Sequence, residues 1–281
     1  MRFVIQHHTH YNYSHNIELG PQLLRFYPRS DSLQSVISYQ IQITPTPVGC
    51  NEYLDLEGNR VRQVWFDGVT SELDIQVNMM VDTHTRPKLE GFLAPQALLL
   101  PIQHEHDYSY VQAYLQRIDM DDSVTVFAAE LSIAVSHQTL AFLNQLNHQL
   151  HNEFHQIHRD SGPPQTPAFT LQTRHGACRD LALLFVDCCR AEGVAARFVS
   201  GYQKGDTTNQ LRHLHAWPEV YLPGAGWYAY DPTHGEAVSD THVTIAAAAH
   251  PEDTMPVTGS YDAQGANSTL DYQINIQSMI I

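Results

Sequence analysis

The sequence predicts an α+β protein of two units, an all-β sandwich-like unit over residues 1–115 and a mixed unit of helices and strands over residues 116–281. Three observations predict this class. Strand-like alternation fills the first third of the chain, helix-like spacing begins near Ser123, and a segment with three prolines, residues 86–107, lies between them. Because proline interrupts both helices and central strands, we expect this segment to cross between the units.

The first unit is predicted from the alternation of apolar and polar residues. Apolar side chains occupy every second position over residues 37–43 and again over 73–81, as expected for strands with one buried face. The Glu-Gly-Asn stretch at residues 57–59 is typical of a hairpin turn before a strand at 61–66. Further strands are expected near residues 2–13, 23–28 and 50–56.

The second unit is predicted to begin with helices. Apolar residues recur at a spacing of four from Phe127 to Val135, and at spacings of three and four over residues 140–154. A leucine-rich helix is expected over residues 178–192, with Gly193 as its C-terminal cap. A mobile loop is expected at residues 204–212, and strands at 195–203, 214–222, 227–230, 242–247, 255–261 and 269–277.

Composition narrows the classes of function. Thirty acidic residues against fifteen lysines and arginines give a formal net charge of −15, which would repel nucleic-acid phosphates and an anionic membrane surface. No apolar run has the length of a signal peptide core or a membrane-spanning helix, so we expect a cytoplasmic protein. Four cysteines in 281 residues do not indicate a disulfide framework, so reduced thiols are expected.

One cysteine lies in a context that favours a nucleophile. Cys178 follows Gly176 and Ala177 where a loop enters the helix predicted at residues 178–192. Free N–H groups and the positive end of the helix dipole favour an anion there, so this thiol is expected to ionise more easily than an ordinary cysteine. Gly176 leaves room for a substrate to approach.

His215 and Asp231 are the expected partners of this thiol. Eighteen histidines make a bare cysteine–histidine argument weak, but His215 stands at a loop-to-strand junction, where a side chain is held firmly at the edge of a cleft. Asp231 closes the next predicted strand, and the Pro-Gly-Ala-Gly turn at residues 223–226 brings the two strands side by side. An aspartate in this position would fix the imidazole tautomer and stabilise its cation.

Two stretches of the sequence resemble the core of the transglutaminase-like superfamily. They are GACRDLALLFVDCCRAEGVAARFVSGY at residues 176–202 and HAWPEVYLPGAGWYAYDPTHG at residues 215–235. Residues 1–110 resemble the N-terminal β-domain that accompanies this core in bacterial transglutaminase-like proteins, often described as proposed cysteine proteases. The resemblance implies a papain-like core, in which a helix that carries the cysteine packs on an antiparallel sheet.

The resemblance also implies acyl chemistry, with Cys178 as nucleophile, His215 as proton carrier and Asp231 as the group that orients the histidine. The thiolate would attack a peptide or amide carbonyl to give a thioester, with the Cys178 N–H as one oxyanion donor and the second donor unassigned. We expect water to accept the acyl group, hence a cysteine protease or amidase. The sequence shows no cluster of calcium ligands of the kind that would indicate a regulated cross-linking enzyme. The alternatives are a protein-glutamine transglutaminase and a non-catalytic binding protein that retains the fold.

No cofactor and no metal are expected, and the predicted partner is a peptide or protein amide; the oligomeric state stays open. Histidines at spacings of three and four on one predicted helical face are a rival metal site, although a solvated polar face is favoured. They are His148, His151, His155 and His158. A second group falls on an early predicted strand, where neighbours point to opposite faces: His7, His8, His10 and His15.

Several other residues near the predicted site have two interpretations. Asp180 either tunes the thiol or favours the helix N-terminus as any carboxylate does, and we favour the second. Trp217 and Trp227 either wall the cleft and shield the histidine–aspartate pair or belong to the core. Cys188 and Cys189 are expected in the core, because apolar residues surround them in the predicted helix.

Overall fold

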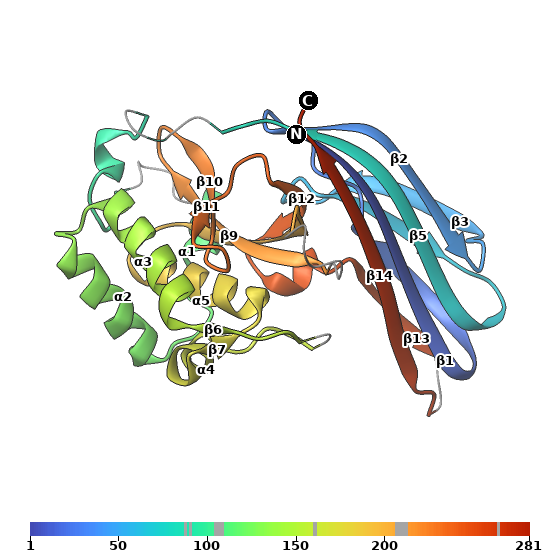
Figure 1. The fold of residues 1–281 in the computed structure, drawn as a ribbon. Coiled ribbons are helices and arrows are strands. Elements are labelled where there is room, and N and C mark those ends of the chain that lie inside the picture. The colour runs from blue at the N-terminus through green and yellow to red at the C-terminus, as the bar shows by residue number, and fades with distance from the viewer. Residues whose placement is uncertain (87–88, 90–91, 104–109, 160–161, 206–212, 263–264) are drawn as a thin grey trace.

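The computed structural model describes residues 1–281 except 87–88, 90–91, 104–109, 160–161, 206–212 and 263–264. In Figure 1 a large curved sheet lies on one side, and a unit of helices with a smaller sheet lies on the other. The predicted α+β class is confirmed, with a β-rich first unit and a mixed second unit.

The first sheet is built around its longest strand, β1. The first half of β1 pairs with β5 and β14, and its second half pairs mainly with β4 and β13, all antiparallel. The strand order is β2-β5-β1-β4-β3, with β13 and β14 also on β1. The strands of this sheet are β1 (Arg2–Leu24), β2 (Gln34–Thr44), β3 (Gly49–Leu54), β4 (Arg60–Trp65), β5 (Val69–Thr83), β13 (Val257–Asp262) and β14 (Ser268–Met279).

One face of this sheet is buried, as the alternation predicts. On β5 every second side chain is at most 2% exposed, namely Leu73, Ile75, Val77, Met79 and Val81. The strand expected near residues 23–28 is instead the end of β1, because Leu24 still pairs with Arg62 of β4 and the chain leaves the sheet after it.

The chain returns to the first sheet at its end. The predicted division at residues 115 and 116 assigned the last strands to the second unit, yet β13 and β14 pair with β1. The pairing with β14 is long, from Arg2 opposite Met279 to Tyr13 opposite Ser268. The first sheet therefore needs both ends of the sequence.

Helices cover one face of the smaller sheet of the second unit. The helices are α1 (Gln112–Leu115), α2 (Asp122–Ala134), α3 (Thr139–Glu153), α4 (Pro167–Thr173) and α5 (Cys178–Ala191), with 3-10 turns η1 (Pro95–Ala97) and η3 (Pro251–Thr254). The sheet order is β11-β10-β9-β8-β12. Its strands are β8 (Ala196–Gln203), β9 (His215–Leu222), β10 (Gly226–Asp231), β11 (Glu236–Ala237) and β12 (His242–Ala248), and a short parallel pair joins β6 (His155–Gln156) to β7 (His175–Gly176).

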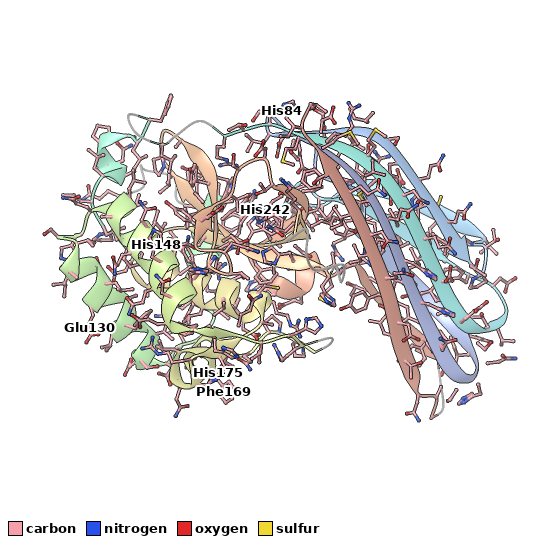
Figure 2. The ribbon with its side chains drawn as sticks, in the orientation of Figure 1. His84, Glu130, His148, Phe169, His175 and His242 are labelled. Atoms are coloured by element: carbon pink, nitrogen blue, oxygen red, sulfur yellow. The ribbon has the colours of Figure 1, made fainter. Side chains whose placement is uncertain are left out.

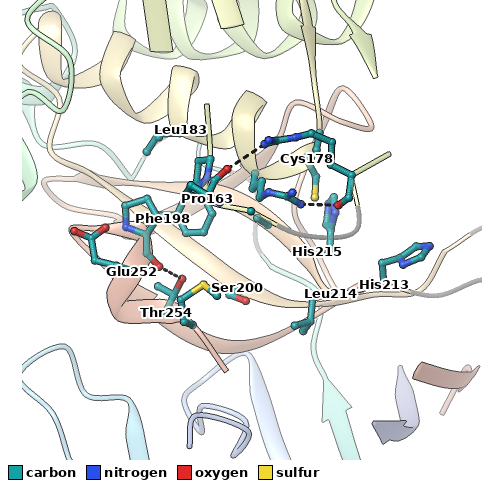
Figure 3. A pocket seen from close by; sticks show the side chains of 18 of the residues that line it. Pro163, Cys178, Leu183, Phe198, Ser200, His213, Leu214, His215, Glu252 and Thr254 are labelled. Atoms are coloured by element: carbon teal, nitrogen blue, oxygen red, sulfur yellow. Dashed lines mark hydrogen bonds between the residues drawn. The ribbon is translucent and has the colours of Figure 1, made fainter. Parts of the chain in front are cut away.

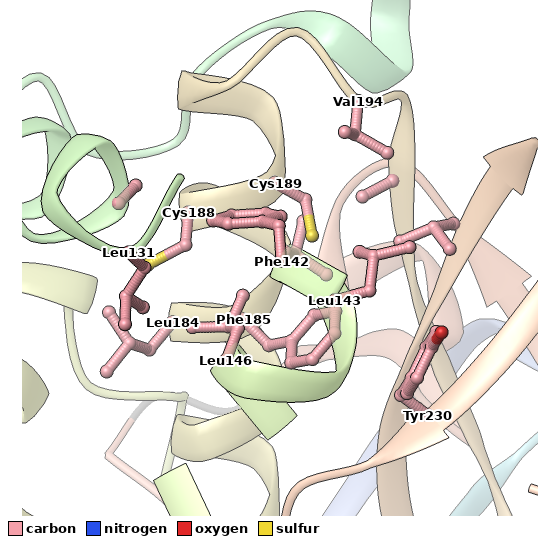
Figure 4. Close-up of a cluster of buried hydrophobic side chains, with 14 of the residues drawn as sticks. Leu131, Phe142, Leu143, Leu146, Leu184, Phe185, Cys188, Cys189, Val194 and Tyr230 are labelled. Atoms are coloured by element: carbon pink, nitrogen blue, oxygen red, sulfur yellow. The ribbon is translucent and has the colours of Figure 1, made fainter. Parts of the chain in front are cut away.

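Helix α5 runs through the core of this unit. Its side chains pack between α2 and α3 on one side and the sheet on the other, as Figure 4 shows for Phe185 and Leu184. Full burial of a side chain such as Phe185 contributes about 1.5–3 kcal/mol. Cys188 and Cys189 are completely buried in the same cluster, which confirms their predicted place in the core.

Two charged side chains of α5 tie loops to the helix. Asp187 is fully buried and accepts hydrogen bonds from the Arg117 guanidinium at 2.8 and 2.9 Å and from the Ile118 N–H at 2.8 Å. Arg190 donates to the backbone carbonyls of Gln116, Ala196 and Ala249. Because these bonds satisfy buried charges, the position of α5 is fixed along its length.

Polar side chains of the first unit hold strand β12 of the second. Asn59 donates to the Ala247 carbonyl and accepts from the Ala247 N–H, both at 2.9 Å. Gln34 makes the same pair of bonds with Thr244, both at 2.8 Å. Each amide side chain thus pairs with the backbone of β12, at the edge of the smaller sheet, as a neighbouring strand would. These bonds join the two units at Thr244 and Ala247.

Removal of β14 should destabilise the protein strongly. A chain that ends at residue 267 loses the antiparallel ladder on β1 and leaves the β1 edge and the cluster around Ile274 open to water. We expect the melting temperature to fall by on the order of 10 °C, measured by circular dichroism. Removal of Ile280 and Ile281 alone, which follow β14 and are exposed, is the matched control. Equal melting temperatures for both truncated chains would contradict this assignment.

Candidate active site

Cys178 begins α5, as predicted. The residue before it, Ala177, has an extended backbone and caps the helix, and Arg174, which directly follows α4, is in the left-handed conformation. Gly176 lies so close to Asp180 that a Cβ atom there would approach the Asp180 Cβ to 2.9 Å. Glycine is therefore required by close packing inside the turn that leads to the thiol.

Asp180 fixes the start of α5. Its carboxylate is fully buried and accepts a hydrogen bond from the Ala177 N–H at 2.8 Å. The other oxygen accepts from the Arg159 guanidinium at 2.5 Å and from the Gln165 N–H at 2.7 Å. These bonds support the favoured interpretation of Asp180 as a helix-start carboxylate, and they anchor one wall of the cleft to α5.

The three residues singled out by the sequence come together. The Cys178 side chain points toward His215, at the start of β9 (Figure 3). His215 Nε2 lies 2.8 Å from Asp231 Oδ2, at the end of β10. His215 therefore lies between the thiol and the carboxylate.

The electrostatics of this arrangement favour a thiolate–imidazolium pair. Burial works against ionisation of Cys178, but the hydrogen bond and charge of His215 lower the pKa of the thiol. Burial also works against the cation of His215, yet Asp231 and the thiolate raise the pKa of the imidazole to about 10. The pKa of Asp231 lies well below its ordinary value despite burial, because His215 is close and three imidazoles bond to it.

Asp231 has two further histidine partners that the sequence analysis missed. Asp231 Oδ2 accepts from His234 Nδ1 at 2.7 Å and from His242 Nε2 at 2.9 Å, in addition to His215. His234 lies three residues beyond Asp231 in the same turn, a spacing that could have been noticed. His242 comes from β12, and no local motif marks it.

These imidazoles also lie close enough together to hold a metal ion. The ligand atoms of His215, Asp231 and His234 are within 4.8 Å of one another. Each nitrogen, however, is within hydrogen-bonding distance of the same carboxylate oxygen. Hydrogen bonding accounts for the cluster.

Trp217 and Trp227 have different surroundings. The Trp217 indole is fully buried and stacks against the His215 ring, with 5.9 Å between centroids, and its edge meets His242 at 5.0 Å. It therefore packs against two of the imidazoles that bond to Asp231. Trp227 instead lies under the Arg197 guanidinium, 4.1 Å from its ring centroid, and takes no part in the site.

The thiol opens into a large cleft between the two units. The cavity has a volume of about 1330 Å³ and is lined by Cys178, His215 and apolar side chains that include Leu183 and Phe198 (Figure 3). The first unit contributes a wall through residues such as Tyr272 on β14. The part of the expected loop at residues 206–212 lies outside the described residues.

The histidine stripe is not one helical face. Helix α3 ends at Glu153, because Phe154 is extended and β6 then pairs with β7. Only His148 and His151 are helical; Figure 2 shows His148 on α3 and His242 within the smaller sheet. His155 and His158 lie beyond the helix and contact other rings, so the prediction of one shared face was wrong.

Fold and site together place a cysteine, a histidine and an aspartate in one cleft. A cysteine at the start of a buried helix faces a histidine and an aspartate on adjacent antiparallel strands. Residues 3–82 match the Bacterial transglutaminase-like N-terminal region, and residues 128–232 match the Transglutaminase-like superfamily. The chain therefore belongs to the transglutaminase-like superfamily.

Individual proteins are similar to this chain in fold or in sequence. The crystal structure of a proposed cysteine protease from Cytophaga hutchinsonii superposes with a TM-score of 0.73 and 18% identity, over 100% of this chain and 92% of that chain. An uncharacterized protein of Mycobacterium tuberculosis, Rv2569c, is 23% identical over 295 residues, covering 98% of this chain and 92% of its own length. A protein-glutamine gamma-glutamyltransferase of Pseudomonas aeruginosa is 37% identical over 84 residues, which are 26% of this chain and 13% of that protein.

Within the described residues, no helix has the length and apolar character needed to cross a membrane. The cytoplasmic location expected from the sequence stays a prediction.

Cys178 should be the first thiol to react with iodoacetamide. Because the pKa of Cys178 lies below the ordinary thiol value of 9.0, this residue forms thiolate at a lower pH than an ordinary cysteine does. Its imidazolium partner, His215, persists until the pH rises through about 10. Cys188 and Cys189 are buried with raised pKa values, so they should stay unmodified in the folded protein. Peptide mapping at about pH 6 measures the order, and Cys50→Ser removes the exposed competitor as a control. Faster labelling of Cys50 than of Cys178 would exclude an activated Cys178.

Proposed function

We propose that this protein is a cysteine-dependent acyl hydrolase that acts on peptide or amide substrates. The observation that carries the proposal is the arrangement of Cys178, His215 and Asp231, in which His215 faces the thiol and bonds to Asp231 at 2.8 Å, with the thiol at the edge of the cleft. A reactive thiol in a substrate-sized cleft is the arrangement that acyl transfer requires.

The first half of the proposed reaction forms a thioester. Cys178 Sγ bonds to the carbonyl carbon while the carbonyl oxygen becomes an oxyanion near the Cys178 N–H, at the positive end of α5. The tetrahedral intermediate collapses as the C–N bond breaks, and His215 gives its proton to the departing amine. Asp231 holds His215 in the required tautomer and stabilises its charge.

The second half releases the acid. His215, now neutral, takes a proton from water as the water oxygen bonds to the thioester carbon. The C–S bond then breaks, the carboxylic acid leaves, and the thiolate–imidazolium pair returns. An amine could replace water in this step without a change in any protein group.

Transfer to an amine is the second candidate. It is supported by the 37% identity to the Pseudomonas aeruginosa protein-glutamine gamma-glutamyltransferase, although the match spans 13% of that protein. Hydrolysis remains the leading proposal, because the cleft between the units is large and gives water a route to the thioester. A non-catalytic binding protein is disfavoured by the intact arrangement of Cys178, His215 and Asp231 in one cleft.

Asp231→Asn should reduce acylation by about 100-fold or more, since the corresponding change in a serine-protease triad costs on the order of 10⁴. A neutral amide carries no charge to stabilise the imidazolium. Its NH₂ group would also face N–H groups that donate hydrogen bonds to the carboxylate in the unaltered protein. The rate of thiol acylation by p-nitrophenyl acetate measures the effect, with thermal melting as a check on folding. Asp271→Asn, at an exposed carboxylate, is the control. An acylation rate near that of the unaltered protein would remove Asp231 from the mechanism.

Water should be the preferred acceptor. A glutamine-containing peptide is supplied together with a primary amine, and the hydrolysed and aminated products are compared by mass spectrometry. We expect the hydrolysed product to dominate at millimolar amine, with neither product from Cys178→Ala. Dominant amination would establish the transferase instead, and the roles of Cys178, His215 and Asp231 would be unchanged.

A further inference from the structure

Three imidazoles converge on one oxygen of Asp231. His215, His234 and His242 all place a ring nitrogen 2.7–2.9 Å from Asp231 Oδ2. They come from three segments of the second unit: the start of β9, the turn after β10, and β12. Among them, His215 is the imidazole that faces the thiol and lowers its pKa.

The bonding pattern fixes the protons of the two additional histidines. An ionised carboxylate only accepts hydrogen bonds, so the facing nitrogen of each ring must carry a proton. For His242 this is Nε2, which leaves Nδ1 to accept from the Thr241 hydroxyl at 2.9 Å. Burial lowers the pKa of His242 despite its bond to Asp231, so this ring is a neutral donor with a defined tautomer.

These donors hold the carboxylate from the sides that His215 leaves open. Asp231 Oδ1 accepts from the backbone N–H groups of Thr233 at 2.9 Å and His234 at 3.3 Å. Oδ2 accepts from the His234 and His242 rings. Since the Asp231 side chain is fully buried, these N–H groups replace the water that would otherwise solvate its charge.

We propose that His242 and His234 are positioning residues, which keep Asp231 ionised and aimed at His215 and thereby keep Cys178 a thiolate. The inference rests on the cysteine–histidine pair of the proposed function, but not on which acyl acceptor that pair uses. The ionisable groups that face Asp231 are His215 on β9, His234 in its own turn, His242 on β12 and, through His215, Cys178 on α5.

The sign of the effect follows from the charges of Asp231 and His215. If the donors on Asp231 are lost, the carboxylate is free to rotate away from His215. The imidazolium then loses its stabilising charge, so the pKa of His215 falls and the pKa of Cys178 rises toward that of an ordinary thiol. A histidine that only filled space would change stability and leave both values in place.

The test is the pH dependence of Cys178 alkylation by iodoacetamide, in a Cys50→Ser background that removes the exposed competing thiol. His242→Leu fills a similar volume without a donor, whereas His242→Gln places an amide N–H near the position of Nε2. We expect His242→Leu to raise the alkylation midpoint by about one pH unit or more, and His242→Gln to restore it.

His234 supplies a second pair of variants. Its side chain is 42% exposed, so substitution should leave folding intact. His234→Ala removes the donor, and His234→Asn places an amide N–H near the position of Nδ1. The midpoint should rise in His234→Ala and return in His234→Asn.

Two outcomes separate this inference from the proposed function. Unchanged midpoints in folded His242→Leu and His234→Ala proteins would overturn the positioning role alone, with the cysteine–histidine pair intact. An ordinary thiol midpoint in the unaltered protein would overturn the thiolate–imidazolium pair itself, and the positioning role with it.

Discussion

The site depends on one buried negative charge, that of Asp231. A carboxylate without solvent exposure is stable only where N–H groups replace water, and five N–H groups from three segments do so here. The same charge raises the pKa of His215 to about 10, and His215 in turn lowers the pKa of Cys178. The reactivity of the thiol is therefore set by the environment of a carboxylate that does not touch it.

Helix α5 connects this electrostatic arrangement to the fold. Its apolar side chains form the core, Asp187 and Arg190 hold loops to its flank, and Asp180 fixes the turn before Cys178. The helix start is thereby placed against β9, where the histidine begins the strand. The first unit then closes one side of the cleft and is held to β12 by Asn59 and Gln34.

Much of this could be predicted from the sequence, since local patterns carry it. Alternation located β5, and the cysteine two residues after Gly176, ahead of a leucine-rich stretch, located the start of α5. Contacts between distant segments could not be predicted. The alternation in β14 identifies a strand but not its partner β1, and nothing near His242 indicates a bond to Asp231. The end of α3 was missed because the histidine spacing continues past Glu153, while backbone pairing of β6 with β7 decides the conformation.

The protonation state of His215 tests the account most directly. In protein with ¹⁵N-labelled histidine, nuclear magnetic resonance distinguishes an imidazolium, with both ring nitrogens protonated, from a neutral ring with one. Because the pKa of His215 is raised to about 10 by Asp231 and the thiolate, the account predicts an imidazolium at about pH 7, where a free histidine is mostly neutral. A neutral His215 ring at that pH, with a single protonated nitrogen, would contradict it.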